Sequence, residues 1–254
     1  MRLVLTLRST RSSPYDLCYH RNLQGFIYSL IRSAGYPDLH NKPGCKFFSF
    51  SNLFPPGRRI EAGSKKTLVV SSPDREMIAS LQDEAARSEG EEIRIGDMTF
   101  RLQGSKTVER NVPGGFEEFL LESGTPIVVR IPQYRLREYG IETARNYDYV
   151  YWRKDHTPTP FIKQLEENLI KKYGEFSGTE TDGTPIFEKV RFLKQVAVPL
   201  HIDQRETTVI GTLWEFYLRA LDERRRDMLQ FALDAGFGEM NSLGFGFMNL
   251  VGSD

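Results

Sequence analysis

Apolar side chains recur at every second position near the start of the chain, at Leu3, Leu5 and Leu7, which is typical of a half-buried strand. From residue 21 to 34 they recur every three or four positions, which predicts an amphipathic helix that ends at Gly35. Alternation, β-branched runs and helical spacing predict the elements that follow: strand 46–54, strand 67–70, helix 74–90 and strand 93–102.

This βαββαβ order is that of the ferredoxin-like, or RRM-like, unit, in which two helices cover one face of a four-stranded antiparallel sheet. Residues 112–115 (Val-Pro-Gly-Gly) are the best boundary signal. Beyond them the pattern repeats, with strands 125–131 and 149–152, helix 160–172, hairpin strands 186–202 and 206–218, helix 222–235 and strand 245–251. We therefore predict an α+β protein of two tandem ferredoxin-like domains, residues 1–112 and 116–254.

Residues 236–248 form a glycine-rich segment between the last predicted helix and strand, GFGEMNSLGFGFM. Its glycines can adopt positive φ and let another backbone approach closely. Such a loop can present amide groups to phosphate oxygens. The alternative is a purely structural role, as a helix cap followed by a tight turn whose phenylalanines lie in the core. The segment matches neither GxGxxG after a strand nor GxxxxGK[ST], so a nucleoside phosphate is not favoured.

Composition narrows the class of protein. At 254 residues, with 39 % hydrophobic and 27 % charged, the chain can build a core of ordinary size. No stretch approaches the roughly 18 apolar residues of a membrane span, and Arg8 interrupts the N-terminus too early for a secretion signal. Cys18 and Cys45 can pair at most once and form no CxxC motif. We expect a cytoplasmic protein without a membrane partner, metal or cofactor.

The formal net charge of zero conceals a segregation along the chain. Residues 1–73 hold 11 Lys and Arg against 3 Asp and Glu, whereas residues 74–125 hold 6 against 12. Because a binding field arises from local clustering and not from the sum, the N-terminal third is where a polyanion would be bound. The alternative is that these charges fold into a mixed surface.

Three residues of the basic third could cleave RNA without a metal. Tyr28 is next to the core-facing Ile27 on the first helix, His40 is in a polar loop, and Lys46 begins the next strand. Cleavage by the 2′-hydroxyl needs a group that takes a proton, a group that protonates the departing 5′-oxygen, and a cation facing the phosphorane. These residue types are common, so the trio does not indicate this chemistry by itself.

The segment LQGFIY (residues 23–28), the downstream histidine and lysine, and above all GFGEMNSLGFGF resemble the CRISPR-associated endoribonucleases of the RAMP superfamily, which cut precursor CRISPR RNA at each repeat. The resemblance implies tandem ferredoxin-like domains with RNA in a positive groove between them. It also implies metal-independent cleavage that leaves a 2′,3′-cyclic phosphate and a 5′-hydroxyl. Tyr28, His40 and Lys46 correspond in order and interval to a catalytic triad of this family.

Within that resemblance we assign His40 as general acid to the leaving oxygen, Lys46 as the cation at the transition state, and Tyr28 as base or orienter of the 2′-hydroxyl. Because tyrosine, with an ordinary pKa near 10, is a poor base at neutral pH, Tyr28 and His40 could exchange these roles.

Further RNA contacts are expected from three regions. His20 and Arg21 begin the first helix, where His20 could alternatively cap it, and Arg191 and Lys194 lie in the first hairpin strand, where they could alternatively be a solvated edge. His156 and His201 are interpreted as structural. In the glycine-rich segment the candidate RNA contacts are Gly236, Gly238, Asn241, Ser242, Gly244 and Gly246.

The predicted partner is CRISPR repeat RNA, the precursor crRNA. Homodimerisation and association with other CRISPR-associated effector subunits stay open. Two alternative functions are a subunit of an interference complex that binds repeat RNA without cutting it, and a small-molecule enzyme that holds a nucleotide phosphate in the glycine-rich segment.

Overall fold

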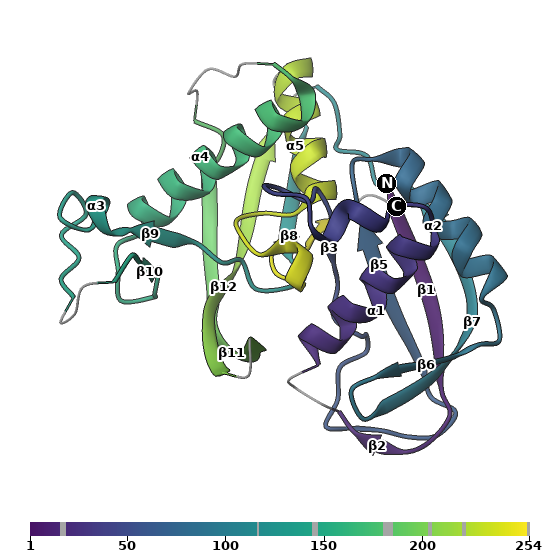
Figure 1. Ribbon diagram of the computed structural model, residues 1–254. Helices are drawn as coiled ribbons and strands as arrows, with labels where there is room; N and C mark the ends of the chain where they lie inside the picture. Colours follow the sequence, from purple (N-terminus) through teal and green to yellow (C-terminus); the bar gives the residue numbers. More distant parts are fainter. Residues whose placement is uncertain are drawn as a thin grey trace.

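The computed structural model describes residues 1–15, 19–115, 117–143, 147–179, 185–202, 205–219 and 222–252. Its two main sheets are antiparallel and belong to two lobes (Figure 1). None of the described helices is long and apolar enough to cross a membrane.

The first lobe carries a sheet with the strand order β3-β5-β1-β7-β6, and the helices α1 and α2 cover one face of it. Without β6 this is the ferredoxin-like order. Its elements are β1 (Arg2–Ser9), β2 (Ser13–Pro14), α1 (His20–Ser33), the 3-10 helix η1 (Pro37–His40), β3 (Ser49–Phe50), β4 (Arg59–Ile60), β5 (Lys65–Ser71), α2 (Arg75–Arg87), β6 (Glu92–Ile95) and β7 (Met98–Val108).

The second lobe repeats that topology in the order β11-β12-β8-β13, with helices α4 and α5. The prediction of two tandem ferredoxin-like units is therefore confirmed. The elements are β8 (Glu118–Ser123), β9 (Arg130–Pro132), α3 (Gln133–Leu136), β10 (Tyr149–Tyr151), α4 (Pro158–Ser177), β11 (Lys189–Ile202), β12 (Arg205–Arg219), α5 (Glu223–Ala235), the 3-10 helix η2 (Asn241–Leu243) and β13 (Met248–Val251).

Three strand predictions need correction. The strand predicted at 93–102 is the hairpin of β6 and β7, which turns at Gly96. The strand predicted at 46–54 pairs with β5 over β3 and again at an isolated bridge between Phe54 and Thr67. The first strand of the second sheet is β8. The predicted strand 125–131 forms isolated bridges at Ile127 and Val128, where it is buried between β12 and the glycine-rich segment, and its last two residues begin β9. The predicted domain boundary falls between β7 and β8 and stays a prediction.

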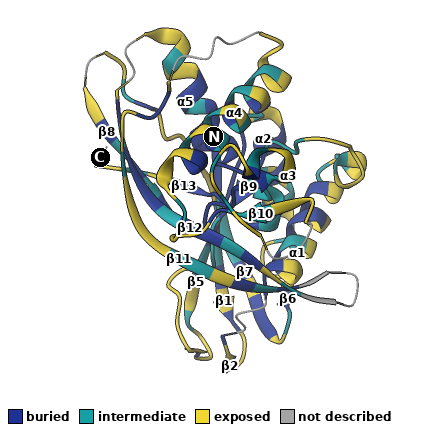
Figure 2. Ribbon diagram, turned by 90° about the vertical axis from the view of Figure 1, so that its left-hand side faces the viewer, coloured by how far each residue is buried: buried dark blue, intermediate teal, exposed yellow. Residues whose placement is uncertain are grey.

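Each lobe has its own hydrophobic core. Leu3, Leu5 and Leu7 of β1 are fully buried under α1 and α2, as their alternation predicts. In the second lobe Phe161 of α4 stacks on Trp214 of β12, with ring centroids 4.4 Å apart. Figure 2 shows the buried positions along the strands and the inner faces of the helices.

The glycine-rich segment (residues 236–248) lies between the two lobes (Figure 1). At Gly244 (φ +88°) a Cβ would lie 2.5 Å from the Phe50 ring of the first lobe, and at Gly246 (φ +69°) it would overlap the carbonyl oxygen of Phe237. Both positions combine positive φ with backbone or ring contact at the Cβ site. Only glycine therefore fits between the lobes at these positions.

We expect Gly246→Ala to lower the free energy of unfolding by about 3 kcal/mol or more, because the new methyl group meets rigid backbone in a strained conformation. Gly25→Ala is the matched control: Gly25 is exposed in α1 with open space around its Cα, so alanine should stabilise the protein by about 0.5–1 kcal/mol. Urea unfolding of both variants tests this. Equal stability of Gly246→Ala and the unsubstituted protein would contradict the packing argument.

Candidate active site

The structure brings Tyr28 and His40 together. Tyr28 is on α1 with its ring 7 % exposed, and His40 is the last residue of η1, with its side chain exposed. Their rings meet edge to face, with centroids 4.7 Å apart and planes at 74°. On another side the Tyr28 ring contacts Phe48. An accessible imidazole thus rests on a phenol that the core holds in place.

The Tyr28 hydroxyl is linked to the glycine-rich segment of the other lobe. Burial raises the pKa of Tyr28 above its ordinary value, and a hydrogen bond with the Ser242 side chain opposes that rise. Four residues earlier on α1, the Gln24 side-chain amide donates to the backbone carbonyl of Ser242 over 2.9 Å. Ser242, predicted as an RNA contact, therefore also positions the Tyr28 phenol.

A neighbouring amide constrains the proton position on His40. Its Nδ1 lies 3.1 Å from Oδ1 of Asn41. In the tautomer in which Nδ1 donates to this amide oxygen, Nε2 is the atom left for proton transfer.

Lys46 lies nearby but touches neither residue. In the described part of the chain no hydrogen bond or ring contact joins it to Tyr28 or His40. It lines a pocket of about 650 Å³ together with Leu39 and Asn41, the neighbours of His40 on both sides. Burial, and then the charge of Lys42, lowers its pKa from the ordinary value. The triad is thus a contacting pair with an ammonium group on an adjoining pocket wall.

The glycine-rich segment does not present its amide groups outward as expected. The amides of Gly236, Gly244 and Gly246 donate to the carbonyl oxygens of Ala232, Asn241 and Pro126. These glycines are buried, so the prediction that their amides bind phosphate is wrong. The alternative prediction, a helix cap followed by a tight turn, describes these glycines better.

Gly238 and Asn241 are also committed within the protein. Gly238 is buried, and a Cβ there would lie 2.5 Å from the Val128 carbonyl oxygen. The Asn241 amide nitrogen donates to the carbonyl oxygens of Phe237 and Phe245, both at 3.0 Å. Both residues shape the segment, and their contact with RNA stays a prediction.

A buried lysine that sequence analysis missed holds this segment. Lys172 of α4 is 4 % exposed, and its Nζ donates to the carbonyl oxygens of Gly236 (2.7 Å) and Gly238 (3.0 Å) and to Oδ1 of Asn241 (3.0 Å). Three acceptors match the three protons of an ammonium group. The sequence signal for its burial was its position in the helix, three residues after the core residue Leu169 and so on the same face.

At the start of α1 the two predicted contacts differ. Arg21 is exposed and stays a predicted RNA contact. His20 is buried, and its ring stacks on Tyr19 at 5.0 Å and on Phe245 at 5.5 Å between centroids. The structure thus gives His20 a packing role between the lobes, since Phe245 belongs to the glycine-rich segment.

On the long hairpin, Arg191 and Lys194 are exposed on β11 as expected. Arg191 forms a bidentate pair with Glu215 of β12, at 2.7 and 2.5 Å, and that carboxylate raises its pKa. A phosphate would have to compete with Glu215 for this guanidinium. The hairpin tip, residues 203–204, and the His201 side chain lie outside the described residues.

Strand register reveals a basic row on the first sheet. Arg8 of β1 lies opposite Lys65 of β5 on one side and opposite Arg101 of β7 on the other. All three side chains are exposed. Like charges directly across neighbouring strands destabilise a sheet, and Glu92 of β6 lies opposite only the Arg101 end of the row, so a polyanion would relieve the repulsion around Arg8. Sequence analysis missed the row because these residues become neighbours only through the pairing of three strands.

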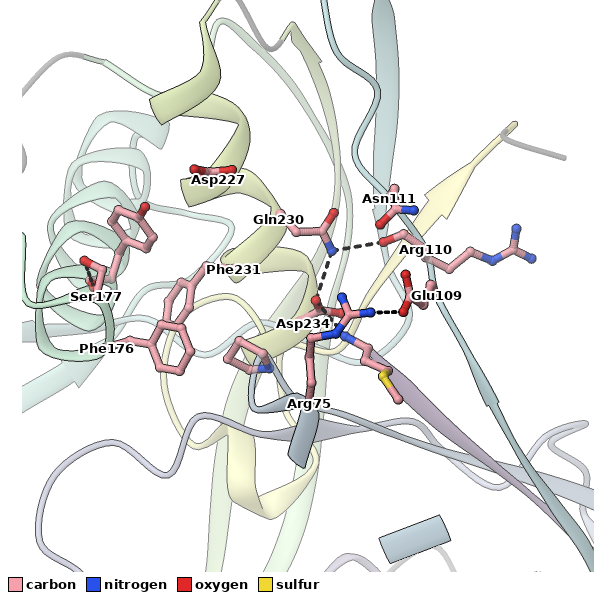
Figure 3. Close-up of a pocket in the computed structure, with 13 residues that line it drawn as sticks. Arg75, Glu109, Arg110, Asn111, Phe176, Ser177, Asp227, Gln230, Phe231 and Asp234 are labelled. Carbon is pink, nitrogen blue, oxygen red and sulfur yellow. Dashed lines mark hydrogen bonds and ion pairs between the residues drawn. The ribbon is translucent and has the colours of Figure 1, made fainter. Parts of the chain in front are cut away.

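A second pocket of about 260 Å³ lies between the lobes, and Figure 3 shows its lining. Phe176 and Phe231 stand on one side, with ring centroids 5.2 Å apart, and an ion pair between Arg75 and Glu109 lies across from them. Gln230 of α5 bridges the Arg110 carbonyl of the segment that follows β7 and the Asp234 carboxylate. These contacts join the lobes without presenting a net charge for RNA.

Comparison with known proteins identifies the family. The model of "CRISPR associated protein Cas6, C-terminal" matches residues 109–250. A CRISPR-associated endoribonuclease Cas6 of Haloferax mediterranei is 31 % identical over 99 % of this chain and 94 % of its own length. The chain belongs to the Cas6 family.

Two further comparisons agree with this assignment. A Cas6 endoribonuclease of Methanocaldococcus jannaschii is 32 % identical, covering 99 % of this chain and all of that relative. A solved structure described as CRISPR associated protein Cas6 superposes with a TM-score of 0.72 at 24 % identity, over 99 % of each chain. The resemblance seen in the sequence motifs is therefore confirmed over nearly the whole chain.

Lys172 gives a pH-dependent prediction. Burial lowers its pKa from 10.5 to about 8, so the unfolded chain keeps this proton to higher pH than the folded chain. The contribution of Lys172 to the free energy of unfolding should therefore increase from about pH 8 to about pH 10.5, by up to roughly 3 kcal/mol.

Urea unfolding between about pH 7 and pH 10 measures this rise. Lys172→Met should lack it, whereas Lys171→Met, on the exposed face of the same helix, should retain it. Parallel pH profiles of the unsubstituted protein and Lys172→Met would show that the ammonium group does not titrate as expected.

Proposed function

We propose that this Cas6 family member is the endoribonuclease that cuts precursor CRISPR RNA once within each repeat, by attack of a ribose 2′-hydroxyl on the adjacent phosphate. The observation that carries the proposal is the contact of an exposed imidazole, His40, with the buried phenol of Tyr28, beside the glycine-rich segment. The nucleophile is the RNA's own hydroxyl and not water, no metal takes part, and the products are a 2′,3′-cyclic phosphate and a 5′-hydroxyl.

The proposed roles follow from proton balance. The 2′-oxygen loses its proton to solvent as it bonds to phosphorus, and the 5′-oxygen gains a proton from His40 as its bond to phosphorus breaks. In the proposed step His40 donates a proton from Nε2 to the departing 5′-oxygen, while its Nδ1–H group stays hydrogen-bonded to Oδ1 of Asn41. Lys46 places positive charge toward the phosphorane oxygens, where it counts most as negative charge develops.

The surroundings of Tyr28 favour orientation over base catalysis. Because burial raises its pKa, the phenolate is even less populated at neutral pH than for an exposed tyrosine. As a neutral phenol that is hydrogen-bonded to Ser242, it can hold the 2′-hydroxyl in line with the phosphate. Positioning of this kind contributes several kcal/mol to such reactions.

The proposed partner is the CRISPR repeat RNA. Its phosphates would meet the basic row of Arg8, Lys65 and Arg101, and the exposed Arg21 and Lys194. Electrostatic contacts of this kind make RNA affinity depend strongly on salt. We place the reaction in the cytoplasm, where the precursor transcript is made.

The metal-independent course predicts that repeat RNA from the CRISPR array of the source genome is cut equally well in EDTA and in Mg²⁺. The same RNA with a 2′-deoxy nucleotide at the cut should not be cut, because it lacks the nucleophile. A denaturing gel of end-labelled RNA, with product ends mapped, measures both.

The outcomes separate the candidates. Loss of cutting in EDTA, or cutting of the deoxy substrate, contradicts the mechanism. Tight binding without any fragments would instead indicate the subunit that binds repeat RNA without cleaving it. A thermal shift with nucleotides and no binding of RNA would indicate the small-molecule enzyme.

His40→Ala should lower the single-turnover rate by roughly 100-fold or more, because a general acid contributes at least that factor. RNA affinity should stay nearly unchanged, since the substitution removes no phosphate-binding cation from the basic row. His156→Ala is the control and should cut at the unsubstituted rate, because His156 lies beyond β10, with its Nδ1 accepting from the Arg153 amide. An unaltered rate for His40→Ala would remove His40 from catalysis.

A further inference from the structure

The pocket beside the triad has aromatic side chains from both lobes. Its lining includes Tyr36 and Phe47 of the first lobe and Phe176 from the end of α4 in the second. Phe176 is 42 % exposed and meets Phe47 edge to face, with centroids 5.4 Å apart. We call this cavity of about 650 Å³ the Phe176 pocket. Its volume exceeds that of a nucleobase.

Phe47 is held there in an unfavourable backbone conformation. Its φ is +51°, the left-handed region that non-glycine residues rarely adopt. The Ser72 hydroxyl donates to its carbonyl oxygen over 2.8 Å, and its ring also packs on Phe231. Such conformations persist where the surroundings impose them, and they gather at ligand sites. Here the strained backbone directs an aromatic ring to the junction of the lobes.

The charges on the lining favour a base inside the pocket and a phosphate at its edge. Lys42 and Lys46 are attractive to phosphate, but Asp38 and Asp74 also line the cavity and would repel it. Asp74 Oδ1 already accepts from the Met77 amide at the start of α2. The carboxylates can accept hydrogen bonds from the N–H groups of a base, and each base offers a π face to a phenylalanine.

We propose that the Phe176 pocket binds the unpaired base of one nucleotide next to the scissile linkage, with that base stacked on Phe176. The proposal rests on the proposed endoribonuclease function, and it adds a recognition site to it. Continuity with the triad supports this occupant: Lys46 belongs to both, and Leu39 and Asn41 line the pocket on either side of His40. A nucleotide whose phosphate faces Lys46 and His40 has its base within reach of the cavity.

The test combines removal of the base with removal of the ring. After the cut is mapped, the repeat RNA is prepared with an abasic site at either nucleotide flanking it. At one of the two positions, removal of the base should lower kcat/KM about 10-fold or more with the unsubstituted protein. With Phe176→Ala the same removal should lower kcat/KM less than about 2-fold, because the stacking ring is already absent. Phe54→Ala, which truncates an exposed phenylalanine outside the pocket, should keep the full 10-fold sensitivity.

A binding measurement separates stacking from catalysis. The uncleavable 2′-deoxy RNA carries 2-aminopurine at the same position, whose fluorescence falls on stacking. The fluorescence should fall with the unsubstituted protein and with Phe54→Ala. It should also fall with Phe176→Tyr, which keeps an aromatic ring, but not with Phe176→Ala. Cutting without sensitivity to either abasic site, or equal quenching by Phe176→Ala, overturns the pocket proposal alone. Absence of any cutting overturns the proposed function and this inference with it.

Discussion

Close packing of backbone in the glycine-rich segment is the constraint on which the site depends. Gly244 rests against the Phe50 ring of the first lobe, and Gly246 against the Phe237 carbonyl, so neither position has space for a Cβ. This packing brings Ser242 of the second lobe to the Tyr28 hydroxyl of the first. A residue of the candidate active site is therefore oriented by a segment more than 200 positions away along the chain.

A single buried charge completes that arrangement. The ammonium group of Lys172 satisfies three acceptors of the glycine-rich segment, two of which are backbone carbonyls. Burial makes this charge costly, which its lowered pKa expresses. The same segment also packs on His20. The glycines thus act as a joint between the lobes and not as a phosphate cradle.

Two regions of the surface differ in charge and are suited to different parts of an RNA. The row of Arg8, Lys65 and Arg101 concentrates positive charge that the neutral total conceals. The Phe176 pocket, by contrast, mixes two lysines with two aspartates around aromatic rings. The first suits a phosphate backbone, and the second suits a base. His40, exposed and supported by Tyr28, lies beside the pocket.

The sequence by itself determined the tandem fold and the three candidate catalytic residues, because periodicity reports which side of an element is buried and the resemblance lay in contiguous motifs. It misjudged the amides of Gly236, Gly244 and Gly246, whose hydrogen-bond partners are set by tertiary packing. Only the folded chain decided that Arg8, Lys65 and Arg101 are neighbours, since cross-strand register depends on pairing between distant segments. It likewise placed Phe176 beside Phe47, a contact between lobes that no local pattern encodes.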